Sequence, residues 1–360
     1  MPRPATRPVL AIKSKSGELE AVSNEPATHV QVMIELLPGV LPEGPIGKQV
    51  LNVAVDAVAE GNPVWLDTTW LPAGNAAAST PTPVLTDFDG VLDEIIQEMI
   101  PGHDEPILLP VVAADADDRR LRAMREFLQH KPRPVVVRAR RAAPADVEPW
   151  ARIERIATAL RIGVEDLHLV FDEGYLPSVP DHRVEALGKN ITGLNARHGC
   201  ASITVLGGSI PKERTGFVTR TRERTEIRLW KSARADCDGS LRYGDYGVVH
   251  PVPRSKTKGS GAPNPYLHYT VPGGVLSFAR HVPDRNGRAL PTGAAERFFR
   301  DVAEELVRRP EFAGPSFSWG DEKLYSCREN PAIPIGRADK WIALATSHHL
   351  AHLSRDMDAS

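Results

Sequence analysis

Cysteine is scarce in this sequence. Its 360 residues include three cysteines, Cys200, Cys237 and Cys327, which are far apart and form no CxxC pair. The spacing excludes a paired-cysteine metal or redox motif, and an odd number of thiols does not suit a disulfide framework. We therefore predict that all three are free thiols.

Long hydrophobic runs are also missing. No apolar stretch is long enough for a membrane-spanning helix, and Met1-Pro2-Arg3-Pro4 leads into a short run without the apolar core of a secretion signal. We therefore expect a cytoplasmic protein that has no membrane partner.

Neither charge sign is in excess. The chain carries 44 basic and 46 acidic residues, a net charge of −2, so no overall field would steer it onto nucleic acid. Apolar residues make up 41% and charged residues 25% of the chain, which excludes a disordered or fibrous protein. The length suits a barrel of about 250 residues with additional segments.

Short apolar runs alternate with stretches of helical period along most of the chain. This alternation predicts parallel strands joined by crossover helices. We place the strands at residues 9–12, 30–34, 64–66, 107–112, 134–137, 167–171, 202–206 and 225–229. Helices are predicted at residues 48–60, 88–99 after the capping Asp87, 118–129, 149–161 and 181–198.

Eight such units predict an α/β fold, a (β/α)8 TIM-like barrel with a C-terminal extension. An open doubly wound sheet gives the same local pattern, but eight units in succession favour closure, which leaves no exposed edge. We assign residues 1–250 to the barrel and 251–360 to an extension packed on the barrel mouth. In the extension we expect a hairpin at 267–270 and 275–280, and a helix at 294–308. The polar loops at 72–83 and 251–265 are either surface linkers or lids over the mouth.

Charged residues follow six of the runs. They are Lys13, Glu35, Asp67, Asp115, Arg138 and Asp172. Because the C-terminal ends of barrel strands converge, these side chains are expected to form a ring around a shared pocket. The alternative is that polar residues simply mark where each strand leaves the core. The eighth run adds Glu226, Arg228 and Trp230 at alternating positions, which would share one side of a strand.

The seventh run ends in glycines. Gly207-Gly208-Ser209-Ile210-Pro211 is followed by a basic stretch that contains Lys212, Arg214, Arg220, Arg222 and Arg224. Barrels often bind phosphate after strands seven and eight, so this segment is a candidate phosphate clamp. The alternative is a tight turn followed by a solvated basic helix. We expect no nucleic-acid partner, because Phe217 is the one aromatic residue among the basic ones.

Several motifs occur in the order shown by the bacterial and phage "beta protein" family, which the sequence resembles over nearly its whole length. They are IKSKSGE at 12–18, IELLP at 34–38, LW at 229–230, YGDY at 243–246, HP at 250–251, FSWGD at 317–321, Trp341 and HH at 348–349. Leu37 and Ile210 depart from the family pattern. The family has no settled activity, and its association with phages implies a role in phage–host conflict.

The family motifs point to a second polar set. Asp245 and Asp321 each follow a glycine and lie beside aromatic residues, Tyr246 and Trp319. Such an aspartate either presents its carboxylate to a ligand or only caps its own turn. His348 and His349 are adjacent and must diverge, so at most one of them is expected to reach the mouth.

The first functional hypothesis is a metal-dependent phosphoric-ester hydrolase that acts on a nucleotide-like, phosphate-bearing substrate. Glu35, Asp67 and Asp172 would hold Mg²⁺ or Mn²⁺, and Asp245 or His348 would be the general base. Candidate substrate-binding residues are Lys13, Lys15, Arg138, Gly208, Ser209, Glu226, Trp230, Tyr246, Trp319 and Asp321.

The second hypothesis is a non-catalytic module that senses a ligand or binds a protein partner. The charged ring would then form ion pairs, Lys13 with Glu35 and Arg138 with Asp172, and would turn over nothing. The sequence leaves open both the choice between these hypotheses and the oligomeric state.

Overall fold

A computed structural model describes residues 7–71, 81–140, 149–197, 199–212, 216–235, 241–253, 264–281, 294–330 and 338–356. The chain divides into two compact units. The barrel unit comprises Met1–Ser14, Thr28–Gly208 and Thr225–Tyr246, and the second unit comprises Lys15–Ala27, Ser209–Arg224 and Gly247–Ser360. The packing of residues 251–360 on the barrel mouth stays a prediction.

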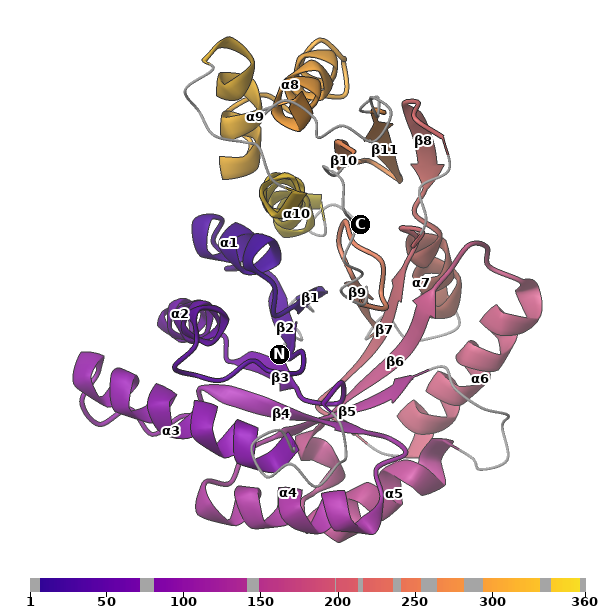
Figure 1. Ribbon diagram of the computed structural model, residues 1–360. Helices are drawn as coiled ribbons and strands as arrows, with labels where there is room; N and C mark the ends of the chain where they lie inside the picture. The colour runs from indigo at the N-terminus through magenta and orange to yellow at the C-terminus, as the bar shows by residue number, and fades with distance from the viewer. Residues whose placement is uncertain are drawn as a thin grey trace, which may run out of the picture. The chain divides into compact units, whose positions relative to one another are not determined.

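The barrel unit contains a closed barrel of parallel strands, which confirms the predicted (β/α)8 fold (Figure 1). Every neighbouring pair in the barrel is parallel. Around the barrel the strands are β1 (Val9–Lys13), β2 (Gln31–Glu35), β3 (Val64–Asp67), β4 (Leu108–Ala113), β5 (Val135–Arg140), β6 (Leu167–Tyr175), β7 (Ser202–Gly208) and β9 (Leu241–Asp245).

Helices connect these strands and cover their outer side, as Figure 1 shows. They are α2 (Pro45–Ala59), α3 (Pro81–Met99), α4 (Asp118–His130), α5 (Pro149–Leu160), the short 3₁₀ helix η1 (Val164–Asp166), α6 (Asp181–Arg197) and α7 (Thr225–Ala235). Four predicted helices agree closely, but α3 begins at Pro81 and not after Asp87. The start of α4 is fixed by Asp117, whose carboxylate accepts a hydrogen bond from the Arg120 N–H at 2.8 Å.

The eighth predicted strand was wrong. Residues 225–229 begin helix α7, in which Thr225, Leu229 and Ala233 are buried at a spacing of four residues. The strand that closes the barrel is β9, and it contains no apolar run because Arg242 and Gly244 occupy its inward positions. The guanidinium of Arg242 lies over the Trp65 ring, and its Nε donates to the Arg7 carbonyl at 3.0 Å.

Strand alternation decides which side chains face the barrel interior. One buried cluster draws side chains from seven strands, so it must fill the inside of the barrel. Its members are Val9, Ala11, Met33, Trp65, Leu109, Val111, Val136, Val170, Leu206 and Tyr246. Lys13, Glu35, Asp67, Arg138 and Asp172 each lie two residues further along their strands, on the same face. The charged strand ends therefore point into the barrel, above its apolar layers.

Within the described residues, the second unit combines a small antiparallel sheet with four helices. The sheet has the order β10 (Tyr266–Val271), β11 (Gly274–Ala279) and β8 (Arg220–Glu223), so the predicted hairpin is confirmed. The helices are α1 (Ser16–Asn24), α8 (Ala294–Val307), α9 (Trp319–Glu329) and α10 (Ala338–Asp356).

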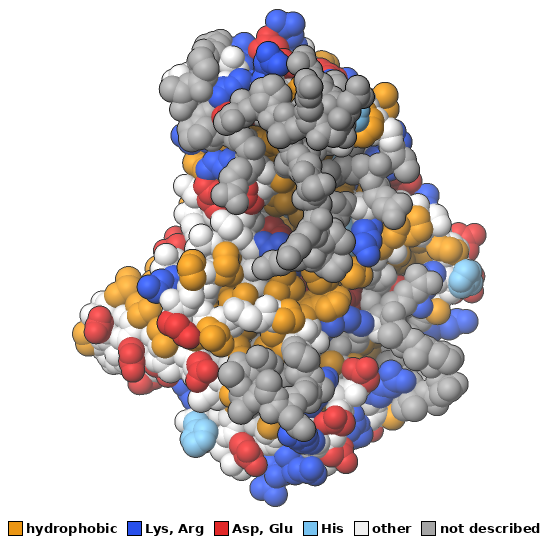
Figure 2. Space-filling view, viewed as in Figure 1, with side chains coloured by type: hydrophobic (Ala, Val, Ile, Leu, Met, Phe, Trp, Pro, Cys, Tyr) orange, Lys and Arg blue, Asp and Glu red, His pale blue; other side chains and the backbone are white. Residues whose placement is uncertain are grey.

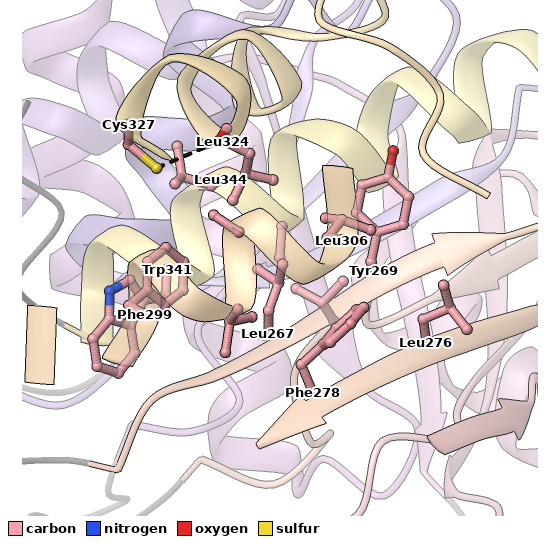
Figure 3. Close-up of a cluster of buried hydrophobic side chains, with 14 residues drawn as sticks. Leu267, Tyr269, Leu276, Phe278, Phe299, Leu306, Leu324, Cys327, Trp341 and Leu344 are labelled. Carbon is pink, nitrogen blue, oxygen red and sulfur yellow. Dashed lines mark hydrogen bonds between the residues drawn. The ribbon is translucent and has the colours of Figure 1, made fainter. Parts of the chain in front are cut away.

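A continuous apolar core holds the second unit together (Figure 3). Trp341 of α10 stacks on Phe299 of α8 with ring centroids 4.8 Å apart, and both side chains are buried. Leu267 and Phe278 enter the same core from the hairpin. Burial of each large apolar side chain contributes roughly 1.5–3 kcal/mol.

The predictions about free cysteines and about membrane-spanning helices can be checked only for the described residues. Cys200 and Cys327 are free thiols, and burial raises the pKa of Cys327 to about 11, while Cys237 lies outside the described residues. Within the described ranges, no helix is long and apolar enough to cross a membrane. The loop segments 72–80 and 254–263, where lids were considered, also fall outside the description.

Candidate functional site

The charged strand ends come together inside the barrel unit. We use "charged cluster" for Lys13, Glu35, Asp67, Arg138, Arg140 and Asp172. The strand register places Lys13 beside Glu35, Glu35 beside Asp67, and Arg140 beside Asp172. Three cations and three carboxylates are present, so the charges of the cluster balance.

Arg138 is the centre of the charged cluster. Its guanidinium is fully buried and contacts three carboxylates: Glu35 Oε1 at 2.8 Å, Asp172 Oδ2 at 2.8 Å, and Asp67 through a short ion pair. Nη2 also donates to the Tyr246 hydroxyl at 2.5 Å. Burial alone would lower the pKa of Arg138, but Tyr246 and the three carboxylates raise it well above its ordinary value. Arg138 is therefore a permanent charge whose hydrogen bonds are used inside the protein.

Glu35 is held ionised despite complete burial. Burial alone would raise its pKa, but Lys13, Arg138, the Trp70 hydrogen bond and Arg140 together lower the pKa to about 2. Lys13 Nζ lies 3.4 Å from Oε2, and Trp70 Nε1 donates to Oε1 at 3.0 Å. The glutamate is thus a fixed negative charge at any physiological pH.

The two aspartates are held by the backbone as well as by Arg138. Asp67 Oδ1 accepts from the Thr69 N–H at 2.7 Å, and Asp172 Oδ1 accepts from the Gly174 N–H at 2.9 Å. Gly174 has a φ of +64°, which glycine adopts readily. These turns orient both carboxylates towards the guanidinium.

Arg140 differs from Arg138 because it is partly open to solvent. Its side chain is 29% exposed, and it lies 3.4 Å from Asp67, 3.6 Å from Asp172 and 3.7 Å from Glu35. The guanidinium stacks on the Trp70 ring at 4.2 Å from the ring centroid. Its ion pairs are looser than those of Arg138, so it is the cation of the charged cluster that can turn towards a ligand.

The arrangement bears on the predicted Mg²⁺ or Mn²⁺ site. Glu35, Asp67 and Asp172 do converge, but the cation between them is the Arg138 guanidinium. Among the described residues, no group of three or more His, Cys, Asp or Glu side chains is arranged to hold a metal ion. A metal would therefore have to displace Arg138, and its presence stays a prediction.

Some predicted site residues in the barrel unit lie away from the charged cluster. Asp115 is exposed in the turn before α4. Asp245 is buried but lies on the outward face of β9, where it accepts a hydrogen bond from the Tyr243 hydroxyl at 2.6 Å. The adjacent Tyr246 faces inward and lies under Lys13, whose Nζ is 5.1 Å from the ring centroid. Of the YGDY motif, the last tyrosine therefore joins the site and the aspartate does not.

Glu226, Arg228 and Trp230 do not share one face of a strand, because they lie on helix α7. Trp230 Nε1 donates to the Leu241 carbonyl at 3.1 Å and anchors this helix to β9. Glu226 packs on β7, where its Cβ would be 3.2 Å from a side chain added at Gly207. An added Cβ at Gly207 would come still closer to Leu176 Cδ1, at 2.7 Å, so Leu176 and α7 together leave little room for a side chain there. Gly208 pairs with Tyr175 at the end of β7.

Five predicted residues belong to the second unit, and four of them are Lys15, Ser209, Trp319 and Asp321. Lys15 precedes α1 and accepts the Leu19 N–H through its carbonyl, and the Trp319 N–H donates to Glu25 Oε2 at 2.8 Å. Asp321 is fully buried and accepts hydrogen bonds from Tyr269 and Ser318 at 2.8 Å and 2.6 Å.

His348, the fifth predicted residue of the second unit, is equally buried. Its Nδ1 lies 2.8 Å from Asp321 Oδ2 and its Nε2 lies 2.8 Å from the Thr270 carbonyl. Both ring nitrogens are therefore occupied within the second unit. The neighbouring His349 contacts Thr270 Oγ1 at 2.8 Å. The FSWGD and HH motifs meet in one buried polar network that joins α9, α10 and β10.

Two residues of the site were missed from the sequence, Trp70 and Arg140. The sequence pattern could have identified Arg140, because Arg138 and Arg140 are two residues apart in a strand and must share a face. Trp70 lies three residues past the end of β3, in a turn whose shape the sequence pattern does not reveal.

Outside the cluster, the barrel surface mixes both charge signs. In Figure 2 the surface of the barrel unit carries acidic side chains over α3, which contains no Lys or Arg, and both charge signs over α4. This distribution agrees with the balanced composition of the chain.

Comparisons with known proteins give one match that covers nearly the whole chain. The family described as Beta protein matches residues 7–355. No curated protein matches the sequence.

The chain is also similar to solved structures that share little sequence with it. One is a 3-hexulose-6-phosphate synthase, 13% identical, with a TM-score of 0.32 over 66% of this chain and 89% of that chain. Another is a beta-mannanase from Streptomyces thermolilacinus, 13% identical, with a TM-score of 0.40 over 67% of this chain and 78% of that chain. A third is the catalytic domain of a mannanase from Streptomyces sp. SirexAA-E, 14% identical, with a TM-score of 0.38 over 67% of this chain and 74% of that chain. At this distance they carry no argument about activity.

Proposed function

The chain belongs to the Beta protein family, and we propose that its barrel unit binds a phosphate-bearing, nucleotide-like small molecule at the charged cluster. The observation that carries this proposal is the state of Arg140. It is a partly exposed guanidinium, loosely paired and stacked on Trp70, above a layer whose other charges are buried and mutually paired.

Arg140 suits an anionic ligand for electrostatic reasons. A guanidinium binds phosphate through two parallel charge-assisted hydrogen bonds, and its planar group already lies near the strand ends where barrels place their ligands. When Arg140 turns to a phosphate, the three carboxylates keep Arg138 and Lys13 as their partners, so no carboxylate is left without a cation. The face of Trp70 that Arg140 covers then becomes available to a planar base.

The proposal is tested by titrating the full-length protein with inorganic pyrophosphate and with ADP in a calorimeter. We expect both to bind, and we expect Arg140→Gln to weaken the binding by at least about tenfold, because charge-assisted hydrogen bonds are lost. Arg122→Gln, at an exposed arginine of α4, is the matched control and should leave binding unchanged. Binding that is equally strong in wild type and Arg140→Gln would contradict the proposal.

A second candidate function is metal-dependent hydrolysis of the same class of ligand. It is favoured by one observation, the convergence of Glu35, Asp67 and Asp172 on a single cation. A divalent ion in place of the guanidinium would have three hard oxygen ligands and could polarise a phosphate. Asp245 points away from these carboxylates, so one of the three would have to accept the proton.

The two candidate functions predict different effects of metal on the midpoint of thermal unfolding. Hydrolysis predicts that Mg²⁺ or Mn²⁺ raises the midpoint of thermal unfolding, and that Asp67→Asn and Asp172→Asn abolish this shift. Ligand binding through Arg140 predicts no metal-dependent shift in any of these proteins. A role in phage–host conflict, a protein partner and a cytoplasmic location stay predictions.

A further inference from the structure

A pocket lies in the barrel unit, at the C-terminal ends of β3 and β4. It has a volume of about 290 Å³ and lies between the first turns of α3 and α4. Among the described residues, none of the charged cluster lines it. It is therefore distinct from the ligand site proposed above.

The inner part of this pocket is apolar. Val111 and Val112 of β4, Ala116 of the following turn and Met124 of α4 line it, and all four are buried. A cavity of this volume is roughly twice one that holds benzene, about 150 Å³, so a body of two rings fits it. Water in such a space would find few hydrogen-bond partners along these walls.

The mouth of the pocket is polar and carries positive charge. Its charged lining residues are Asp117, Arg119 and Arg120, which sum to +1, and they lie at the N-terminus of α4. The Asp117 carboxylate already caps that helix through the Arg120 N–H. Neither guanidinium takes part in an ion pair with a described residue, and the nearby Asp118 pairs with Arg155 at 3.0 Å.

Thr69 adds an unsatisfied group to the wall. Its backbone N–H binds Asp67, but its buried hydroxyl oxygen has no hydrogen-bond partner in the described structure. A buried hydroxyl without a partner costs free energy, which a polar atom of a ligand would remove. Apolar walls, a net positive mouth and this hydroxyl together define an amphipathic ligand.

We propose that this pocket binds a small amphipathic anion, whose two-ring or similarly sized apolar body lies against Val112 and Met124. Its acid group contacts Arg119 and Arg120 at the start of α4. The proposal concerns a ligand class and does not depend on the function of the charged cluster.

The test uses two fluorescent dyes on the full-length protein. 1-Anilinonaphthalene-8-sulfonate has a two-ring body with an attached phenyl ring and an anionic group, and N-phenyl-1-naphthylamine has the same body without the charge. Ala123, a lining residue of α4, is changed to Phe to fill the pocket. Ala57→Phe, on the partly buried face of α2, is the matched control.

We expect the wild type to bind both dyes and Ala123→Phe to weaken both by at least tenfold, while Ala57→Phe binds both like the wild type. The smaller Ala123→Leu replaces Ala123→Phe if that variant unfolds at lower urea concentration. Equal binding by wild type and a folded filling variant would overturn the proposal, because the dyes would then lie elsewhere.

The charge is tested separately. Arg119→Gln/Arg120→Gln should weaken the anionic dye at least fivefold and leave the neutral dye unchanged, whereas Arg122→Gln on the same helix should change neither. The assignment of an anion would be overturned if the double variant bound both dyes more weakly by the same factor, or bound both as tightly as the wild type. Arg140→Gln should not affect either dye, so failure of the charged-cluster proposal is distinguishable from failure here.

Discussion

Arg138 and Arg140 lie two residues apart on one face of β5, but their surroundings give them different roles. Arg138 is fully buried and contacts three carboxylates, whereas Arg140 is 29% exposed and makes longer contacts with the same three. The two residues therefore allow stability to be separated from ligand binding.

Arg138→Gln is expected to destabilise the barrel unit strongly. The substitution leaves buried carboxylates without their main cation, which costs about 3–5 kcal/mol. Arg140→Gln removes a partly solvated charge and should change the free energy of unfolding by less than about 1 kcal/mol. Urea unfolding of both variants measures this, and similar losses in the two would contradict the different roles.

His168 provides a pH-dependent test at the opposite end of the barrel interior. Burial, followed by the charge of Arg242, lowers the pKa of His168 from 6.5 to about 4, and Nδ1 lies 2.8 Å from Ser202 Oγ. The folded state thus favours the neutral ring. Between pH 6.5 and pH 4 the unfolded state binds a proton at His168 that the folded state excludes. The free energy of unfolding is therefore unaffected by this residue above pH 6.5 and decreases as the pH falls from 6.5 to 4.

The expected loss over that pH range is about 3 kcal/mol, at up to about 1.4 kcal/mol for each pH unit. His168→Gln should remove this dependence, because glutamine does not titrate but can still bond Ser202. His130→Gln, at an exposed position at the end of α4, should retain it. Urea unfolding between pH 4 and 7 is the measurement, and an unchanged slope in His168→Gln would contradict the assignment.

At the scale of single residues, the sequence showed which charged side chains meet in the barrel but not which neighbouring residues they contact. Six strand-end residues were expected to share a pocket. Period-two alternation brings five of them together, whereas Asp115 is exposed in the turn before α4. Asp245 was misjudged because its strand was not recognised. Without the register of β9, the sequence could not show that Tyr246, and not Asp245, faces inward.

At the scale of elements, seven strands and the connecting helices could be predicted because their apolar periods are long enough to be read. The eighth strand, β9, could not be predicted in this way. Five residues of α7 contain an apolar alternation that resembles a strand, whereas β9 fills its inward positions with Arg242 and Gly244. The local sequence pattern does not distinguish these two segments, because the partners of Arg242 come from other strands of the barrel. They are Trp65 of β3 and Ser202 of β7.

Helix α10 is approached closely by two other helices through glycines. A side chain at Gly17 of α1 would overlap the Asp339 carbonyl oxygen, and one at Gly320 of α9 would overlap the Leu344 carbonyl oxygen. The ion pair of Lys340 with Glu20 also joins α1 to α10. Small residues at these positions thus set how closely the helices of the second unit pack.

Gly17→Ala and Gly320→Ala are each expected to destabilise the second unit by about 1–3 kcal/mol, because backbone must shift to admit the methyl group. Gly90→Ala in α3 is the control, since nothing lies within 4 Å of its added Cβ. There the higher helix propensity of alanine should stabilise the protein by up to about 1 kcal/mol. Thermal unfolding compares the three, and a neutral Gly17→Ala would contradict the close approach.

At the scale of the whole molecule, the two units are interleaved along the sequence. The chain passes from one unit to the other five times, after Ser14, Ala27, Gly208, Arg224 and Tyr246. The expected boundary near residue 250 follows the last of these passages. The earlier ones were not visible in the sequence, because α1 follows β1 like any barrel helix and only its contacts with α10 assign it to the second unit.

A fragment of residues 1–250 should therefore not behave as an independent domain. It retains α1 and β8 but lacks α10 and β11, on which they pack. Ala21 of α1, which is buried in the full chain and lies one helical turn from Gly17, would be exposed to water, and β8 would lose its partner strand β11. We expect the fragment to aggregate during size-exclusion chromatography, since exposed apolar surface promotes association. Replacing Ala21 by glutamate should reduce this aggregation if the barrel unit folds by itself. A monomeric fragment 1–250 with the urea midpoint of the full chain would instead show that the barrel unit needs nothing from the second.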